Sequence, residues 1–247
     1  MTASKVPQGV PADPSRPRLT LLGGFSLHVG RDAVPLTLSP QRLVALLALH
    51  RSALRRGYVA GLLWGDSTEA RASGCLRSAL WKLRAAGLEV VVGTHTDTLA
   101  LSPDVDVDVR RGTNLARAVI TGSFSEETFA LLDPRLSAEL LPGWDDEWVL
   151  GERERHRQLS LHALELLCEH LTVIGRYGAA VLAGLTAVDR EPLRESAHRA
   201  LMKVHLAEGN AGEAIRRYQH YEAIAARDLG VGPSARMRSL LSQIVTA

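Results

Sequence analysis

Residues 68–86 read TEARASGCLRSALWKLRAA, and their spacing predicts an amphipathic helix. Small and apolar residues recur every three to four positions and would form one buried stripe: Ala72, Leu76, Ala79, Leu80 and Leu83. The residues off this stripe are mostly basic or polar: Arg71, Gly74, Arg77, Ser78, Trp81, Lys82 and Arg84. The helix is therefore predicted to present a basic outer face.

Two shorter helices are predicted before this one. Ser39 suits an N-cap and Pro40 the first helical position, and a second helix is expected from about Tyr58 to Trp64. Short segments of alternating hydrophobicity predict strands at residues 19–22, 25–29 and 34–38. After Gly87, which suits a helix C-cap, a hairpin is expected from residues 89–92 and 98–101 around a polar tip, 93–97. Three helices followed by a β-hairpin give the outline of a winged helix.

From about Val107 the chain is predicted to be almost wholly helical, with an internal period of 34 residues. The period brings these residues into phase: Ala163 with Ala197, Leu167 with Leu201, Gly175 with Gly209, Gly178 with Gly212, Ala180 with Ala214, and Val181 with Ile215. Thirty-four residues is the period of tetratricopeptide repeats, which are helical hairpins. The sequence therefore predicts a fold that is mostly α with a small β part, in which a winged helix precedes an all-α, tetratricopeptide-like domain.

The predicted domains differ in charge. We expect a disordered leader at residues 1–17, a winged helix at 18–104 and the helical domain at 105–247. Residues 1–104 hold 12 Lys and Arg against seven Asp and Glu, net +5, whereas the remainder is net −3. Because its net charge is positive, the first half is the part of the chain expected to be attracted to a polyanion such as DNA. A basic face is also typical of a solvated helix that binds nothing, and Trp81 is interpreted as packing against the core slightly more readily than as contacting a sugar.

Other classes of protein find little support in the sequence. The two cysteines, Cys75 and Cys168, are isolated from any metal-ligand spacing, which argues against a disulfide scaffold and a zinc site. No apolar run is long enough for a membrane helix or a secretion signal, so a cytoplasmic protein is expected. Enzymatic activity is not expected, because no GxxxxGK[ST], GxSxG or HExxH motif occurs.

Two further groups of residues have ordinary explanations. His198 and His205 could share a helix face, but a metal site is not favoured there, and no cofactor is expected. The acidic run Asp145, Asp146 and Glu147 is explained by the helix dipole, since three carboxylates favour a helix start.

The chain after about residue 18 resembles the short form of the Streptomyces antibiotic regulatory protein family. The matching stretches of the winged helix are LTLLGGFSLHVG, QRLVALLALH, YVAGLLWGD and CLRSALWKLR. In the second half they are LLPGWDDEWVLGERERHRQLSLHALELL, EPLRESAHRALMKVHLAEGNAGEAIRRYQHYEAIAARDLGV and GPSARMRSLL. The resemblance implies a response-regulator-type winged helix joined to a bacterial transcriptional activation domain. It also implies a regulator of antibiotic biosynthesis genes, which binds direct repeats in promoter DNA and contacts RNA polymerase.

The resemblance assigns roles by position. Arg77, Ser78, Trp81 and Lys82 would approach bases, and Arg71 and Arg84 would lie nearer phosphate. The wing tip, Thr94, His95 and Thr96, would reach an adjacent minor groove, and Gly65, Asp66 and Ser67 would touch polymerase. Gly74 and Trp81 depart from the usual pattern of the family, which leaves the base contacts open.

Two other functions remain open at this stage. The chain could be a protein-interaction scaffold, or a ligand-sensing regulator with a pocket between helices, in either case with a winged helix that serves protein contacts. Salt dependence separates a DNA-binding protein from a scaffold. A homodimer that forms on the DNA is also possible, and no contact with a membrane is expected.

Overall fold

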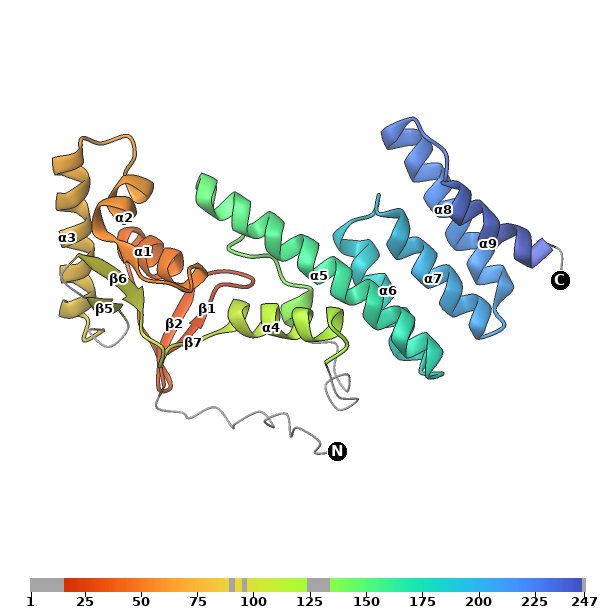
Figure 1. Ribbon diagram of the computed structural model, residues 1–247, viewed down its shortest axis with the longest axis horizontal. Coiled ribbons are helices and arrows are strands. Elements are labelled where there is room, and N and C mark those ends of the chain that lie inside the picture. The colour runs from red at the N-terminus through yellow and green to blue at the C-terminus, as the bar shows by residue number, and fades with distance from the viewer. Residues whose placement is uncertain (1–15, 89–91, 95–96, 124–133, 246–247) are drawn as a thin grey trace. The chain divides into compact units, whose positions relative to one another are not determined.

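The computed structural model describes residues 16–88, 92–94, 97–123 and 134–245 (Figure 1). Almost all of the predicted leader, residues 89–91 of the predicted hairpin, and the tip residues His95 and Thr96 lie outside the described residues. The chain forms two compact units: the first runs to Arg110 and includes Leu140–Leu150, and the second comprises Arg111–Glu139 and the residues from Gly151 onward. The chain thus passes between the units three times. The single boundary after residue 104 between the two functional domains stays a prediction.

The first unit contains a cluster of helices and two small sheets. Its helices are α1 (Leu38–Leu49), α2 (Arg56–Leu63) and α3 (Glu69–Ala85). One sheet has the order β3-β2-β1-β7, formed by β1 (Arg18–Thr20), β2 (Ser26–Val29), β3 (Asp32–Ala33) and β7 (Asp106–Val107). The other has the order β4-β6-β5, formed by β4 (Leu54–Arg55), β5 (Val92–Thr94) and β6 (Thr98–Leu101). The predicted winged helix is confirmed, with β5 and β6 as the wing strands.

Local capping explains why α3 begins and ends where the sequence predicts. The Thr68 hydroxyl oxygen accepts a hydrogen bond from the Arg71 backbone N–H at 3.4 Å. At the other end Gly87 has a φ of 72°, a left-handed conformation that a glycine adopts without strain. Leu88 then donates its N–H back to the Leu83 carbonyl oxygen at 2.9 Å, which ends the helix in a compact turn.

The beginning of α1 differs from the prediction. The helix starts at Leu38 with Thr37 as N-cap, so Ser39 lies inside it, and the predicted strand 34–38 is replaced by the short β3. Pro40 occupies the third helical position, which it tolerates because the first-turn N–H groups of a helix have no partner within the helix. The sequence analysis also missed β4 and β7, which are two-residue strands too short to show a period.

Residues 140–150 belong to the first unit because they pair with its N-terminal strand region. The Leu141 N–H donates to the Leu21 carbonyl oxygen at 2.8 Å, and Leu22 forms a β-bridge with Leu140. The buried Asp108 carboxylate accepts the N–H groups of both Leu21 and Leu22, each at 3.0 Å. These contacts join segments about 90 to 120 residues apart in the chain, which no local pattern indicates.

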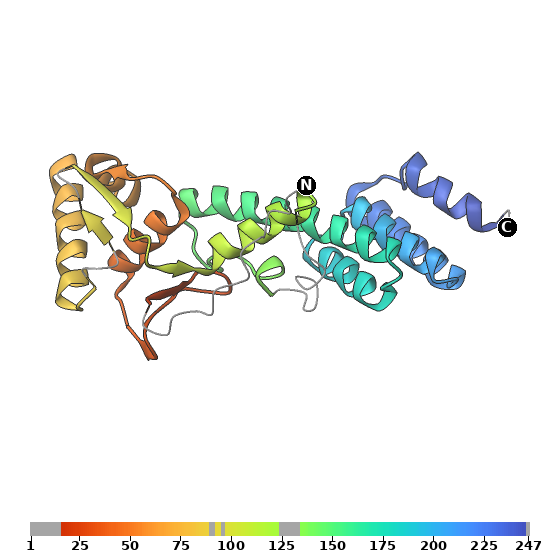
Figure 2. The ribbon, with the colours of Figure 1, turned by 60° about the horizontal axis from the view of Figure 1, so that its bottom comes forward.

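The second unit is a stack of helical hairpins. Its helices are α4 (Asp108–Ile120), α5 (Glu147–Val173), α6 (Tyr177–Arg190), α7 (Glu195–Ala207), α8 (Ala211–Leu229) and α9 (Ala235–Val245), with a short 3-10 helix, η2 (Pro134–Leu136). The first residues of α4 and α5 belong to the first unit. Figure 2 shows α6, α7 and α8 side by side, and α7 packs on both of its neighbours.

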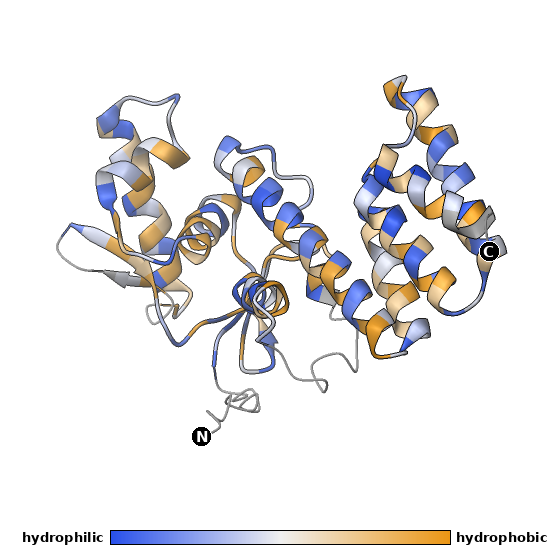
Figure 3. Ribbon diagram, turned by 45° about the vertical axis from the view of Figure 1, so that its right-hand side comes forward, coloured by the Kyte–Doolittle hydropathy of each residue, from blue (hydrophilic) through white to orange (hydrophobic). Residues whose placement is uncertain are grey.

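The 34-residue period is confirmed by the turns and the core of this unit. Gly175 and Gly209 occupy equivalent turns with φ of 73° and 86°. The paired alanines Ala163 and Ala197, and Ala180 and Ala214, are all fully buried. Figure 3 shows hydrophobic and hydrophilic residues on different sides of these helices, as expected where one face of each helix is buried.

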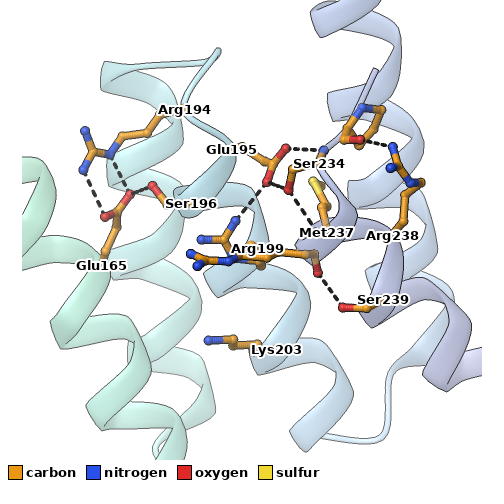
Figure 4. A network of polar contacts seen from close by, with 12 residues as sticks. Glu165, Arg194, Glu195, Ser196, Arg199, Lys203, Ser234, Met237, Arg238 and Ser239 are labelled. Atoms are coloured by element: carbon orange, nitrogen blue, oxygen red, sulfur yellow. Dashed lines mark hydrogen bonds and ion pairs between the residues drawn. The ribbon is translucent and has the colours of Figure 1, made fainter. Parts of the chain in front are cut away.

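Polar contacts connect successive helices of the stack (Figure 4). Glu165 on α5 accepts two hydrogen bonds from the Arg194 guanidinium, at 2.6 and 3.1 Å. Glu195 on α7 accepts the Ser234 N–H at 2.7 Å and an Arg199 N–H at 2.9 Å. Because Ser234 immediately precedes α9, this carboxylate holds α9 against α7.

We predict that the second unit loses stability in mild acid because of two buried histidines. Burial, with the nearby charge of Arg190, lowers the pKa of His156 from 6.5 to about 4, and burial also lowers the pKa of His198 from 6.5 to about 4. The unfolded chain therefore binds protons first, so the stabilisation is complete above pH 6.5 and is lost as the pH falls toward 4. The loss at about pH 5 is on the order of 2 kcal/mol for each histidine.

Urea denaturation followed by circular dichroism at several pH values measures this effect. A variant with both His156→Phe and His198→Phe should show a much flatter dependence between pH 7 and 5. An equally steep dependence in that variant would mean that other groups cause it.

Candidate nucleic-acid interface

The outer face of α3 is exposed as the sequence predicts. The stripe of Ala72, Leu76, Ala79, Leu80 and Leu83 is buried. Arg71, Arg77, Ser78, Trp81, Lys82 and Arg84 are exposed, and Gly74 is half-buried. The packing interpretation of Trp81 is wrong, because its side chain is 67% exposed. An indole on a basic face adds a flat apolar surface among the cations.

The first unit holds this face outward by packing the opposite side of α3. The helix packs against α1 and α2 through its buried stripe. Figure 2 shows α3 at the outside of the first unit, with α1 and α2 on its inner side. The exposed basic residues are thus fixed on a rigid element that the described residues of this unit leave uncovered.

Gly74 leaves a gap in the middle of the basic face. A Cβ atom built at this position would meet one described neighbour within 4 Å, the Nη2 atom of Arg77 at 3.7 Å, which is an ordinary contact distance. The fold itself therefore does not require glycine here, although glycine in a helix costs about 1 kcal/mol relative to alanine. Because glycine has no side chain, the backbone of α3 is accessible at this position, next to Arg77.

The wing lies beside α3 in the same unit. Strands β5 and β6 pair with Val92 opposite Leu101 and Thr94 opposite Leu99, so Thr94 is the last residue of β5. His95 and Thr96 lie outside the described residues. The wing strand β6 also pairs with β4, where Arg55 lies opposite Thr98.

Arg55 is a candidate that the sequence analysis missed. Its side chain is exposed, and its strand is bonded directly to the wing. The signal was present in the run RSALRR at residues 51–56, which places two arginines before α2 and a third at its first residue. The sequence analysis counted charges over whole domains, and such a count does not reveal a short cluster of arginines.

The loop Gly65–Ser67 lines a cleft of about 700 Å³ within the first unit. The opposite side of the cleft is formed by Asp146, Glu147 and Trp148, and Arg42 bridges the two sides through an ion pair with Asp146. Glu147 lies in the first turn of α5, where the helix dipole favours it, whereas Asp146 forms a tertiary contact that the dipole explanation did not foresee. Asp66 itself is exposed.

Potential metal ligands and the two cysteines are dispersed over the described part of the chain. No group of three or more potential metal ligands occurs among these residues. Both cysteines are free, and burial raises the pKa of Cys168 to about 12. Among the helices that the structure describes, none is both long and apolar enough to span a lipid bilayer.

Comparison with known proteins identifies the second half of the chain. Residues 133–245 match the family described as the bacterial transcriptional activator domain. The match covers 113 of the 247 residues of the chain. The activator-domain match and the winged helix before it agree with the organisation that the resemblance to the Streptomyces antibiotic regulatory proteins implies.

A solved structure shares the fold of both units. The structure of EmbR from Mycobacterium tuberculosis, in complex with a low affinity phosphopeptide, matches 94% of this chain with 23% sequence identity and a TM-score of 0.70. The chain spans 65% of the length of that EmbR chain. None of the curated proteins compared with the chain is detectably similar to it.

Proposed function

We propose that the chain is a sequence-specific activator of transcription that binds direct repeats in promoter DNA through the major groove. The observation that carries this proposal is the exposed basic face of α3, held outward by a winged helix that precedes an activator domain. An α-helix fits the major groove, where arginine and lysine pair with the O6 and N7 atoms of guanine. Arg77, Ser78, Trp81 and Lys82 would approach the bases.

Phosphate contacts would surround this reading face. Arg71 and Arg84 lie toward the two ends of α3 and suit the phosphates on either side of the groove. Arg55 beside the wing would contact a further phosphate, and Thr94, His95 and Thr96 at the wing would approach the adjacent minor groove. Gly74 would let the DNA backbone or a base edge approach α3 closely.

The loop Gly65–Ser67 would contact RNA polymerase. A winged helix that buries its third helix and wing in DNA leaves the loop between its second and third helices accessible. The cleft next to Asp66 supports this proposal, because it offers a partner a concave surface with exposed carboxylates. The protein would act in the cytoplasm, as a monomer in solution that forms a homodimer on adjacent repeats. The functional domains would be residues 18–104 for DNA binding and 105–247 for activation.

We predict a steep salt dependence of DNA binding. About four phosphate contacts release about four counterions, so the affinity for promoter DNA should fall roughly 100-fold between about 50 and 200 mM salt. A fluorescence-anisotropy titration of labelled promoter DNA at several salt concentrations measures the slope. A slope near zero would favour a protein-interaction scaffold over a DNA-binding protein.

We predict that Asp66→Arg separates activation from DNA binding. The substitution reverses a charge in the proposed polymerase contact but lies outside the reading face, so operator affinity should stay within about twofold while transcription in a purified polymerase assay falls several-fold. Asp32→Arg is a suitable control, since it makes the same charge change at an exposed position on β3. Equal transcription by the Asp66 and Asp32 variants would exclude this loop as the contact.

A further inference from the structure

A second concave site lies on the activator domain, between α7 and α8. It is a hollow of about 330 Å³ lined by His205 from α7 and by Glu213, Arg216, Arg217 and His220 from α8. Four of these five side chains are cationic or become cationic when protonated. The single carboxylate, Glu213, is already engaged in an ion pair with Arg216.

Two groups in this hollow lack a direct hydrogen-bond partner among the described residues, although the charge of Arg217 also acts on Glu213. Among the residues that the structure describes, the half-buried Arg217 guanidinium has neither a hydrogen bond nor an ion pair. The Nδ1 atom of His205 is buried and also lacks a hydrogen-bond partner. Buried polar atoms in native proteins are generally paired, so the unpaired Nδ1 atom of His205, beside the half-buried Arg217 guanidinium, points to a hydrogen-bonding ligand in this hollow.

A third histidine, neutral because its pKa is about 4, lies next to this hollow. His198 on α7 is fully buried, and its ring lies 6.0 Å from the ring of His220. The charge of Arg217 contributes to the low pKa of both His198 and His205, which places the guanidinium close to both rings. Three imidazoles and two guanidiniums thus gather on the facing sides of two helices.

We propose that this hollow binds the phosphate group of a small molecule, which Arg217 and His205 contact directly. A guanidinium presents a planar fork of N–H donors that matches a phosphate, and a protonated imidazole adds a charge-assisted hydrogen bond. The hollow is larger than one phosphate group requires, so an organic phosphate such as a sugar phosphate suits it better than the inorganic ion. Binding of this anion would make the activator domain responsive to the concentration of a phosphorylated metabolite.

The site should take up a proton when it binds the anion. Burial lowers the pKa of His205, and the charges of Arg217 and Arg216 lower it further, while Glu213 and Glu208 oppose them. A phosphate in the hollow would add negative charge next to His205 and next to His220, and would thereby raise the pKa of His205. His205 should therefore contribute more to the binding of the anion at pH 6 than at pH 8.

The test uses the full chain and follows the histidine ring resonances by NMR during titration with inorganic phosphate and, separately, with ribose 5-phosphate. We expect saturable shifts of the His205 and His220 resonances, with the sugar phosphate binding more tightly. Arg217→Ala should weaken binding at least about tenfold, because it removes a charge-assisted hydrogen bond. His205→Gln should weaken binding more at pH 6 than at pH 8.

A matched control distinguishes this site from general attraction of anions. Arg227→Ala removes one positive charge from the same helix, ten residues further along and outside the hollow. The proposal is overturned if neither phosphate gives a saturable shift, or if Arg227→Ala weakens binding as much as Arg217→Ala. Arg217→Lys guards against a folding defect, since it keeps the charge and should retain part of the affinity in a chain whose thermal melt is unchanged.

Discussion

Arg77→Ala is expected to weaken binding to the preferred operator by about 1 to 3 kcal/mol and to relax the base preference at one position of the site. The side chain is exposed in the middle of α3, next to the gap at Gly74, and can therefore extend into a major groove without displacing any part of the fold. Removing a bidentate contact to guanine removes discrimination between bases as well as affinity. Lys82→Ala, five residues along the same exposed face, should behave in the same way.

Two sets of variants make this prediction specific. Arg71→Ala and Arg84→Ala remove proposed phosphate contacts and should weaken binding to all sequences alike, with a salt slope reduced by about one. Leu76→Ala acts on the buried side of the same helix and should destabilise the first unit by about 2 to 5 kcal/mol through a cavity. Gel-shift titrations on specific and scrambled DNA, together with thermal melts, separate the three outcomes. Unchanged operator binding by all four charge variants would exclude α3 as the reading helix.

Gly184→Val is expected to be among the most disruptive single substitutions in the second unit. A Cβ atom at this position would lie 2.6 Å from Cδ2 and 2.7 Å from Cγ of Leu201, and 3.2 Å from the Cys168 Sγ atom. Leu201 and Cys168 are both fully buried, so neither can move aside without disturbing the core. Overpacking at such a site costs about 1 to 3 kcal/mol or more, and valine adds two further methyl groups beyond the Cβ atom.

Two other glycines of the same hairpins provide the control. A Cβ atom at Gly178 or at Gly212 has no neighbour within 4 Å, and neither residue has a positive φ. Gly178→Ala and Gly212→Ala should therefore be tolerated or slightly stabilising, since alanine is the better helix former. A melting temperature for Gly184→Val as high as that of these two variants would contradict the close packing of α5, α6 and α7.

Local sequence patterns were sufficient to predict those elements in which buried or turn-forming residues recur at a regular spacing. The stripe from Ala72 to Leu83 and the paired glycines at 175 and 209 were predicted correctly, because each repeats a buried or turn-forming residue at a period that the helix geometry imposes. The basic outer face of α3 followed from the same period, since residues off a buried stripe of a helix are exposed. These periodic patterns were sufficient to predict a winged helix followed by a repeat domain.

Contacts between distant segments required the folded structure. Asp108 receives the N–H groups of Leu21 and Leu22, and Asp146 pairs with Arg42 across the cleft beside Asp66. Arg55 reaches the wing only because β4 pairs with β6, and Gly184 is critical only because Leu201 and Cys168 meet there. Periodicity reports which face of an element is buried, but it carries no information about which other element covers that face, so these partners emerge only when the chain folds.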